Sequence, residues 1–285
     1  VHSEAGVSDK AWQALADLGV TALPLPQSVG GFDGNAMDMF IVMEALGRGL
    51  VVEPCFGTAM GAESLRLSGR HAEPLRDVAQ GRLKLACALG ERHSRHDLFD
   101  IALRADRTAQ GYRLDGVKTM VTHGAQAGLL IVSARTSGTQ RQTEGISLFL
   151  VPANAPGVAL RDYRTIDGLR AADVELSDVR LPESALLCPE GEGWPLLESV
   201  TDYGIVLLCG EAVGAMEALN EATLAYLKTR QQFGVPIGKF QVLQHRMVDM
   251  AIHLAQARAI AMLAAATLSS AADPQDRRRM ASAAK

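Results

Sequence analysis

The chain has 285 residues, a formal net charge of −4 and a pI near 6.0, with 48% hydrophobic and 21% charged residues. This length suits one large or two to three small domains, and the composition is typical of a soluble globular protein. The weak negative charge argues against a nucleic-acid-binding protein, and no apolar run approaches the roughly 20 residues of a membrane span. We therefore expect neither a nucleic-acid partner nor a membrane span.

The four cysteines lie far apart, each in an apolar setting: Cys55, Cys87, Cys188 and Cys209. This pattern predicts reduced thiols rather than disulfides or a metal site, and hence a cytoplasmic location. The chain begins with Val1, and residues 280–285 read as the opening of a helix. We therefore expect a fragment at both ends.

The first part of the chain shows helical periodicity. Trp12, Leu15 and Leu18 recur at helical spacing and Gly19 follows them. Three further segments have similar apolar patterns, and Gly81 follows the last of them. The four predicted helices cover residues 8–19, 35–48, 58–67 and 71–80. These helices predict an N-terminal helical domain over residues 1–81.

The pattern changes at Arg82 to short segments rich in Val, Ile, Leu and Tyr, separated by turn signals such as Asp115-Gly116. The predicted strands are residues 83–89, 102–106, 112–116, 128–136, 146–151, 157–163 and 173–181. Strands at this spacing predict a small sandwich or barrel over residues 82–190.

From Gly193 onward the helical period returns, which predicts helices over residues 194–228 and 239–268. Gly204, Gly210 and Gly214 lie inside the first of them, where small residues allow close helix packing. We predict a third, incomplete domain over residues 191–285, a helical bundle. The fold class is therefore α+β.

The corner between these two helices concentrates polar residues, among them Arg230, Gln232 and Gln241. A helix N-terminus carries unpaired N–H groups and about half a positive charge, so this corner suits an anionic ligand such as a pyrophosphate. The alternative is a helical hairpin in which Gly-Val-Pro only turns the chain.

Several motifs across the chain resemble the acyl-CoA dehydrogenase family. The corner carries Arg230-x-Gln232-Phe233-Gly234, Pro236-Ile237 and Phe240-Gln241 where the family has its C-terminal motif. Residues 44–48, 118–124 (KTMVTHG) and 178–182 resemble family segments in the other two domains. The resemblance implies two helical domains flanking a β-barrel, truncated here at both ends, in an oligomer of identical or related subunits.

The resemblance also implies an FAD site. Arg230 would meet the pyrophosphate of FAD, with Gln232, Phe233 and Gln241 around its adenosine-diphosphate half. In the barrel, Thr122 would bond the flavin near its reactive nitrogen. The remaining implied flavin contacts are Leu89, Gly90 and Met120.

This chain departs from the family pattern at several of these positions. Gly90 replaces a threonine hydroxyl, and Met120 replaces the tryptophan that covers the flavin. Ser94 is a candidate substrate contact in an altered segment, and Asp202 is kept as a pantetheine contact although Ile205 replaces an arginine. These changes resemble the pimeloyl-CoA dehydrogenase small-subunit branch.

The implied function is FAD-dependent α,β-dehydrogenation of an acyl-CoA thioester, with electrons passed to an electron-transfer flavoprotein. A carboxylate takes the α proton in this chemistry. The usual glutamate would lie beyond Lys285, and the alternative family position is Gly204, so we name no catalytic base. Two alternatives stay open: a non-catalytic partner subunit of a heteromeric dehydrogenase, and a flavin monooxygenase on the same scaffold.

Two further clusters are interpreted as structural. His93, His96 and Asp97 form a cluster on one predicted loop, without a further ligand anchored on another element. We therefore predict no metal site. The run Arg277–Arg279 is too short for a nucleic-acid patch.

Overall fold

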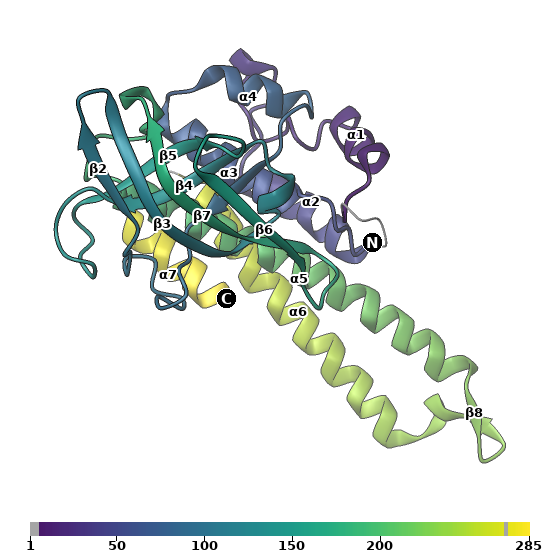
Figure 1. Cartoon of the computed structure of the whole chain (residues 1–285). Coiled ribbons are helices and arrows are strands. Elements are labelled where there is room, and N and C mark those ends of the chain that lie inside the picture. Colours follow the sequence, from purple (N-terminus) through teal and green to yellow (C-terminus); the bar gives the residue numbers. More distant parts are fainter. Residues whose placement is uncertain (1–5, 271–272) are drawn as a thin grey trace. The chain divides into compact units, whose positions relative to one another are not determined.

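A computed structural model of the chain describes residues 6–270 and 273–285 (Figure 1). The fold is α+β, as predicted from the sequence. Its contacts divide the chain into two compact units. The first unit contains the chain up to Gly34 and Val52–Thr201, and the second contains Asn35–Val51 and Asp202–Lys285. The division into three sequence domains stays a prediction.

The first unit begins with three helices, α1 (Asp9–Asp17), α3 (Cys55–Ser68) and α4 (Ala72–Ala79). The Ser8 hydroxyl caps α1 by accepting a hydrogen bond from the backbone N–H of Ala11 at 3.3 Å. The indole N–H of buried Trp12 donates to the Gly81 carbonyl at 2.6 Å, which joins α1 to the chain that follows α4.

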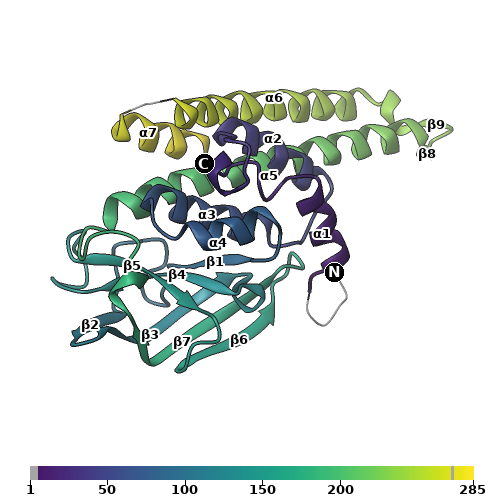
Figure 2. The same ribbon diagram turned by 90° about the horizontal axis from the view of Figure 1, so that it is seen from above.

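All seven predicted strands are present in the first unit. They are β1 (Leu85–Ala88), β2 (Arg104–Thr108), β3 (Gly111–Thr122), β4 (Leu129–Arg135), β5 (Ile146–Pro152), β6 (Val158–Arg164) and β7 (Arg170–Leu181). They form one curled sheet in the order β1-β4-β2-β3-β7-β6, with β5 also paired to β4. Figure 2 shows α3 beside β1, with α4 packed next to α3. Gly61 allows the close approach of α3, since a Cβ there would lie 2.5 Å from the Cβ of Leu85.

Strands β3 and β7 are longer than their sequence patterns predicted. Their antiparallel pairing continues from Tyr112 to Thr122, but the register shifts between Leu114 and Gly116 and again between Lys118 and Val121. Each shift breaks the alternation of apolar residues that marks a strand in the sequence. For β3 the sequence pattern therefore predicted an end at Gly116, whereas the observed strand continues to Thr122.

The second unit is helical, with α2 (Ala36–Arg48), the part of α5 (Trp194–Thr229) from Asp202 onward, α6 (Gln241–Ser269) and α7 (Pro274–Ala284). The prediction of close packing at glycines is confirmed for two of them. A Cβ on Gly210 would lie 2.8 Å from the Phe40 carbonyl oxygen, and one on Gly214 would overlap the Glu44 carbonyl oxygen. Helices α2 and α5 therefore approach closely along this line.

Helix α6 is long and apolar enough, by length and composition, to cross a membrane. Its most apolar window has a mean hydropathy of 1.4, and 17% of that window is buried. This is weak evidence, because core helices of soluble proteins and signal sequences meet the same test. The expected absence of a membrane span stays a prediction.

Candidate functional site

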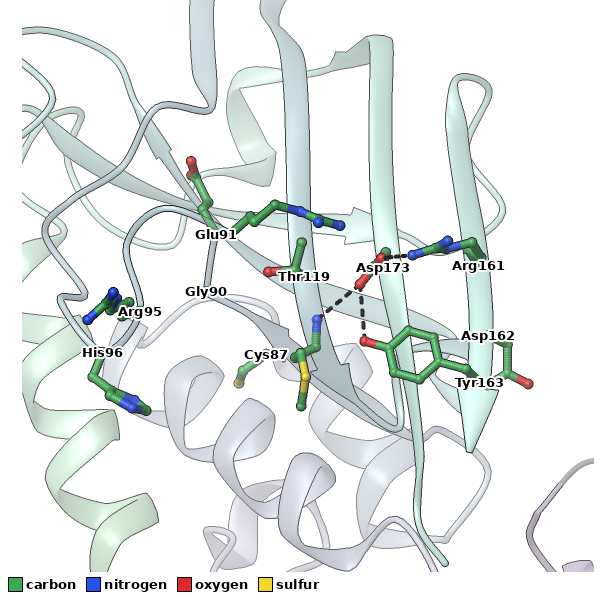
Figure 3. Close-up of a pocket in the computed structure, with 12 residues that line it drawn as sticks. Cys87, Gly90, Glu91, Arg95, His96, Thr119, Arg161, Asp162, Tyr163 and Asp173 are labelled. Atoms are coloured by element: carbon green, nitrogen blue, oxygen red, sulfur yellow. Dashed lines mark hydrogen bonds and ion pairs between the residues drawn. The ribbon is translucent and has the colours of Figure 1, made fainter. Parts of the chain in front are cut away.

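A pocket of about 880 Å³ opens on the sheet of the first unit (Figure 3). Its walls come from the end of β1, the loop that follows, the second irregularity of β3, and the paired strands β6 and β7. The residues that line it are Cys87, Gly90, Glu91, Arg92, Arg95, His96, Thr119, Met120, Arg161, Asp162, Tyr163 and Asp173.

Asp173 of β7 organises one wall of the pocket. It lies opposite Arg161 of β6 in the strand register, and its carboxylate accepts from the Arg161 guanidinium at 2.5 Å. It also accepts from the Tyr163 hydroxyl at 3.1 Å and from the backbone N–H of Met120 at 3.3 Å (Figure 3). Burial opposes its ionisation, but these donors lower the pKa of Asp173 below its ordinary value.

Met120 occupies the irregular part of β3 and projects from the sheet. Its φ of 54° is in the left-handed region, and its side chain is 64% exposed. The preceding residue, Thr119, donates its backbone N–H to the Gly90 carbonyl at 2.9 Å, so the β3 irregularity lies beside the end of β1. Within the described residues, a Cβ on Gly90 would have one neighbour within 4 Å, the Thr119 oxygen at 3.6 Å. The pocket therefore has room for a side chain at Gly90.

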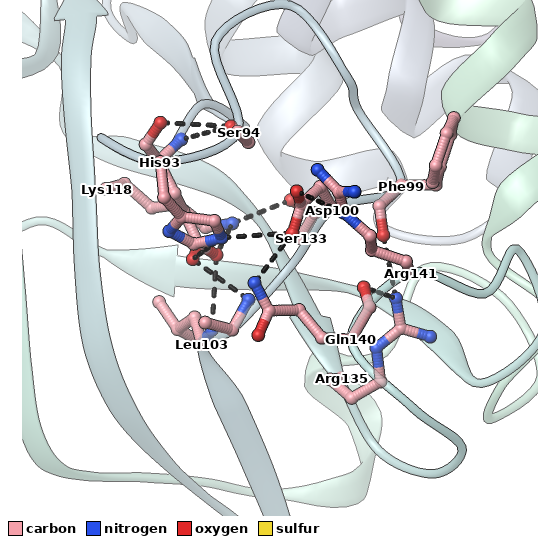
Figure 4. A network of polar contacts seen from close by, with 12 residues as sticks. His93, Ser94, Phe99, Asp100, Leu103, Lys118, Ser133, Arg135, Gln140 and Arg141 are labelled. Atoms are coloured by element: carbon pink, nitrogen blue, oxygen red, sulfur yellow. Dashed lines mark hydrogen bonds and ion pairs between the residues drawn. The ribbon is translucent and has the colours of Figure 1, made fainter.

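A buried ion pair holds the loop after β1 in place (Figure 4). The Lys118 ammonium is fully buried and donates to the Glu91 carboxylate at 2.8 Å, to the Ser133 hydroxyl at 3.0 Å and to the Leu89 carbonyl at 3.2 Å. The Glu91 carboxylate also accepts hydrogen bonds from the backbone N–H groups of Ala102 and Leu103. Burial lowers the pKa of Lys118 to about 8, against the opposing effect of Glu91.

Ser94 closes the turn in this loop. Its hydroxyl accepts from the Glu91 backbone N–H at 3.1 Å and donates to the Glu91 carbonyl at 3.0 Å, and its side chain is buried. Nearby, the Asp100 carboxylate binds His93, Gln140 and Arg141 (Figure 4). The hydroxyl of Ser94 is thus engaged within the loop, and its role as a substrate contact stays a prediction.

Each of the three carboxylates that line the pocket has a cationic partner. Glu91 pairs with Lys118, as described, and Asp173 with Arg161; Asp162 accepts from the Arg170 guanidinium, with an Nε–Oδ1 distance of 3.2 Å. A carboxylate stabilised as an anion is a weak base. Among the three, Asp173 is the group whose pKa is lowered, so it is a poor candidate for proton abstraction.

The corner predicted from the sequence is a small hairpin in the second unit. Helix α5 ends at Thr229, and β8 (Gln231–Gln232) pairs with β9 (Val235–Pro236) before α6 begins at Gln241. Phe233 and Gly234 form the turn, with φ values of 53° and 77°. Phe233 is 92% exposed, and its ring meets that of Phe240 edge to face at 6.0 Å between centroids.

The backbone of this corner is fixed while its polar side chains are open to solvent. The Arg230 N–H donates to the Tyr226 carbonyl and its carbonyl accepts from Ile237, both at 2.8 Å. Arg230, Gln232 and Gln241 are exposed, and Phe240 gives α6 no side-chain cap. An exposed Arg near an uncapped helix start suits a phosphate group, and phosphate binding at this corner stays a prediction.

Two of the four predicted flavin contacts of the barrel line the pocket, and the other two lie next to it in the sequence. Gly90 and Met120 line the pocket. Leu89 and Thr122 do not appear among its lining residues in the described part of the chain: the Leu89 carbonyl binds Lys118, and Thr122 ends β3 opposite Ala171. Their contacts with flavin stay predictions.

Asp202, the predicted pantetheine contact, is buried at the start of the second unit. Its carboxylate accepts from the Arg277 Nε of α7 at 2.8 Å. Its substrate-binding role also stays a prediction.

Several pocket residues were not predicted from the sequence. Arg161, Tyr163 and Asp173 come together only through the pairing of β6 with β7, which no local pattern specifies. Arg92 and Arg95 had a signal, because they are two cations within four residues directly after a strand. No group of three or more His, Cys, Asp or Glu within residues 6–270 and 273–285 is placed to hold a metal ion.

Family models match all three parts of the chain. The N-terminal, middle and C-terminal domain models of acyl-CoA dehydrogenase match residues 1–72, 86–180 and 191–285. The chain is 28% identical to the probable acyl-CoA dehydrogenase YngJ of Bacillus subtilis, over 89% of this chain and 69% of that protein. It is also 28% identical to an L-prolyl-[peptidyl-carrier protein] dehydrogenase of Serratia, over 88% of this chain and 68% of that one.

The fold agrees with solved structures as well. The FAD complex of PigA superposes with a TM-score of 0.88 at 25% identity, covering 97% of this chain and 75% of that one. The chain spans about three fifths to two thirds of the length of the curated relatives it matches.

Proposed function

Because this chain belongs to the acyl-CoA dehydrogenase family, we propose that the protein containing it removes hydrogens from the α and β carbons of an acyl thioester. FAD is the cofactor. The bound cofactor supplies the hydride acceptor in its flavin ring. The observation that carries this proposal is the pocket built on Gly90, Met120 and the Asp173 cluster within the matched middle domain.

The pocket fits the flavin end of FAD. A flat ring system with polar edges needs a broad, partly apolar site with a few donors, and a pocket of about 880 Å³ is within the usual range for such ligands. Met120 offers an apolar side chain, the bare Gly90 leaves space, and Thr119 and Tyr163 carry hydroxyl groups. In this proposal Leu89, Gly90 and Met120 contact the ring, and the Thr122 hydroxyl bonds it near its reactive nitrogen.

The hairpin corner fits the phosphate end of FAD. Arg230 carries a permanent cation whose fork of donors matches a phosphate, and it stands beside the uncapped start of α6. Gln232, Phe233 and Gln241 surround it as exposed groups. We propose that these four residues bind the adenosine-diphosphate half of an FAD whose flavin end is held by a neighbouring subunit.

We assign no base for the α proton among the pocket carboxylates, since each of those is paired with a cation. The reduced flavin would pass its electrons to an electron-transfer flavoprotein, which is the partner that the family resemblance implies.

A second candidate function is a non-catalytic partner subunit. The departures at Gly90 and Met120, which lie in the pocket itself, favour it. Apolar side chains exposed on α5 and α6, among them Leu219, Val242 and Ile252, support assembly with other subunits of this family type. We also propose a reducing, cytoplasmic location, because the four cysteines are free thiols.

The test is anaerobic titration of the purified full-length protein with a panel of acyl-CoA thioesters. We expect the oxidised flavin spectrum to bleach with at least one of them and to recover on addition of electron-transfer flavoprotein. Bound flavin that no thioester bleaches would favour the partner subunit, and co-purification with a second dehydrogenase-type chain would identify its companion. A protein that binds no FAD under any condition contradicts both readings.

A further inference from the structure

Three basic side chains on the loop after β1 have no side-chain partner among the described residues. Arg92, Arg95 and His96 line the pocket and are exposed. Among the residues that the structure describes, none of the three forms an ion pair or a hydrogen bond through its side chain. The carboxylates of the same pocket are already matched by other cations, so this edge of the pocket carries excess positive charge.

The loop presents these side chains from a fixed backbone. The turn is closed by the hydroxyl of Ser94 and tied to the sheet through the buried pair of Glu91 and Lys118. Arg95 has a φ of 50°, and Figure 3 shows it projecting beside His96 from this loop. A ligand that meets a prearranged backbone loses less free energy to ordering than one that meets a mobile segment.

We propose that Arg92, Arg95 and His96 bind the phosphate of the 4′-phosphopantetheine arm of the thioester substrate, an inference that rests on the proposed function. Both kinds of thioester named for the relatives, of coenzyme A and of a peptidyl-carrier protein, hold the acyl group on such an arm. The arm carries a phosphate at the end opposite the thioester. Arginine binds phosphate through paired N–H donors, and an imidazole N–H donates in either protonation state.

This phosphate is distinct from the one assigned to the hairpin corner. Arg230 is proposed to meet the diphosphate of FAD, whereas the loop cations are proposed to meet the substrate. Loss of the loop cations should therefore change thioester binding without changing the FAD content of the protein.

The test compares 4′-phosphopantetheine with pantetheine, which lacks only the phosphate, as ligands of the full-length FAD-loaded protein. In calorimetry or competition titrations we expect the phosphorylated ligand to bind about tenfold more tightly to the unaltered protein. In the Arg92→Gln/Arg95→Gln variant we expect this preference to fall close to one. The control is Arg76→Gln, which removes an exposed arginine of α4 that does not line the pocket and should keep the full preference.

Two results would overturn the inference: no preference for phosphate in the unaltered protein, or an undiminished preference in the double variant. A fall in FAD content that accompanies the loss of preference would also overturn it, because the cations would then serve the cofactor. Binding of the two ligands requires no turnover. Phosphate discrimination without bleaching by any acyl thioester would therefore contradict the proposed function and leave the inference supported.

The same variants distinguish the two sources of the arm. Coenzyme A and a carrier protein in its holo and apo forms are the further probes. Weaker binding of coenzyme A alone to the double variant assigns the phosphate to free thioesters. Weaker binding of the holo carrier protein alone, with the apo form unaffected in both proteins, assigns it to a tethered arm. Either result supports a phosphopantetheine site.

Discussion

His123 should make the free energy of unfolding of the first unit depend on pH. Its imidazole is 2% exposed, its Nδ1 has no hydrogen-bond partner within the described residues, and burial lowers its pKa to about 4. The perturbation is His123→Asn, which removes the titrating group. Asparagine is also suited to the backbone there, because His123 has a φ of 57° and asparagine tolerates the left-handed region better than most residues.

The sign of the effect follows from the two states. The folded protein keeps His123 neutral down to about pH 4, whereas the unfolded chain takes up the proton at its ordinary pKa of about 6.5. The contribution to stability is therefore complete above pH 6.5 and is lost as the pH falls from there toward 4. Between pH 7 and pH 5 the loss from this group is about 2 kcal/mol, and it approaches about 3 kcal/mol near pH 4.

The assay is urea unfolding followed by tryptophan fluorescence, since Trp12 and Trp194 both belong to the first unit. The unaltered protein should lose about 2 kcal/mol more free energy of unfolding between pH 7 and pH 5 than His123→Asn. His71→Asn is the control: His71 also has a positive φ, but it is only half-buried, so its effect should be smaller. Equal losses in the unaltered protein and in His123→Asn would refute the reasoning.

Four further substitutions test the packing and the site. Gly214→Ala should lower the free energy of unfolding by about 1–3 kcal/mol despite the higher helix propensity of alanine, because the added methyl overlaps a carbonyl of α2. Lys118→Met should cost about 3–5 kcal/mol, since it leaves a buried carboxylate without its cation. Arg230→Ala should weaken FAD binding about tenfold at unchanged thermal stability, because an exposed cation adds little to folding. Gly90→Thr should leave stability unchanged and tighten FAD binding severalfold, by about 0.5–1.5 kcal/mol, through one new hydrogen bond.

Each of these substitutions has its own control or opposing result. Gly49→Ala is the control for Gly214→Ala, as a Cβ there meets nothing closer than 3.5 Å, and equal effects of the two would argue against helix contact. A loss below 1 kcal/mol in Lys118→Met would contradict a stabilising role of the buried ion pair. Wild-type FAD affinity in Arg230→Ala would remove that residue from the site. Weaker FAD binding in Gly90→Thr would show that the ring occupies the space left by the glycine.

The sequence was most informative where local physical chemistry is sufficient. The order of helices, strands and helices follows from periodicity and from Gly and Pro punctuation, and the observed elements keep that order. The close packing at Gly210 and Gly214 was also readable, because glycines inside a long apolar helix indicate contact with another backbone. The hairpin corner followed from its motif and from the two helices beside it.

Tertiary structure decided what the pocket contains. Asp173 meets Arg161 and Tyr163 only because β6 and β7 pair in one register, and a shift of one residue would turn these side chains to the other face. The irregularity in β3 that exposes Met120 is likewise a property of strand pairing. Local patterns depend on neighbours along the chain, whereas this pocket depends on neighbours across a sheet. The sequence by itself therefore determined the order of the elements, the family motifs and the charged corner; only the folded sheet determined which carboxylates are paired and which arginines are left for a ligand.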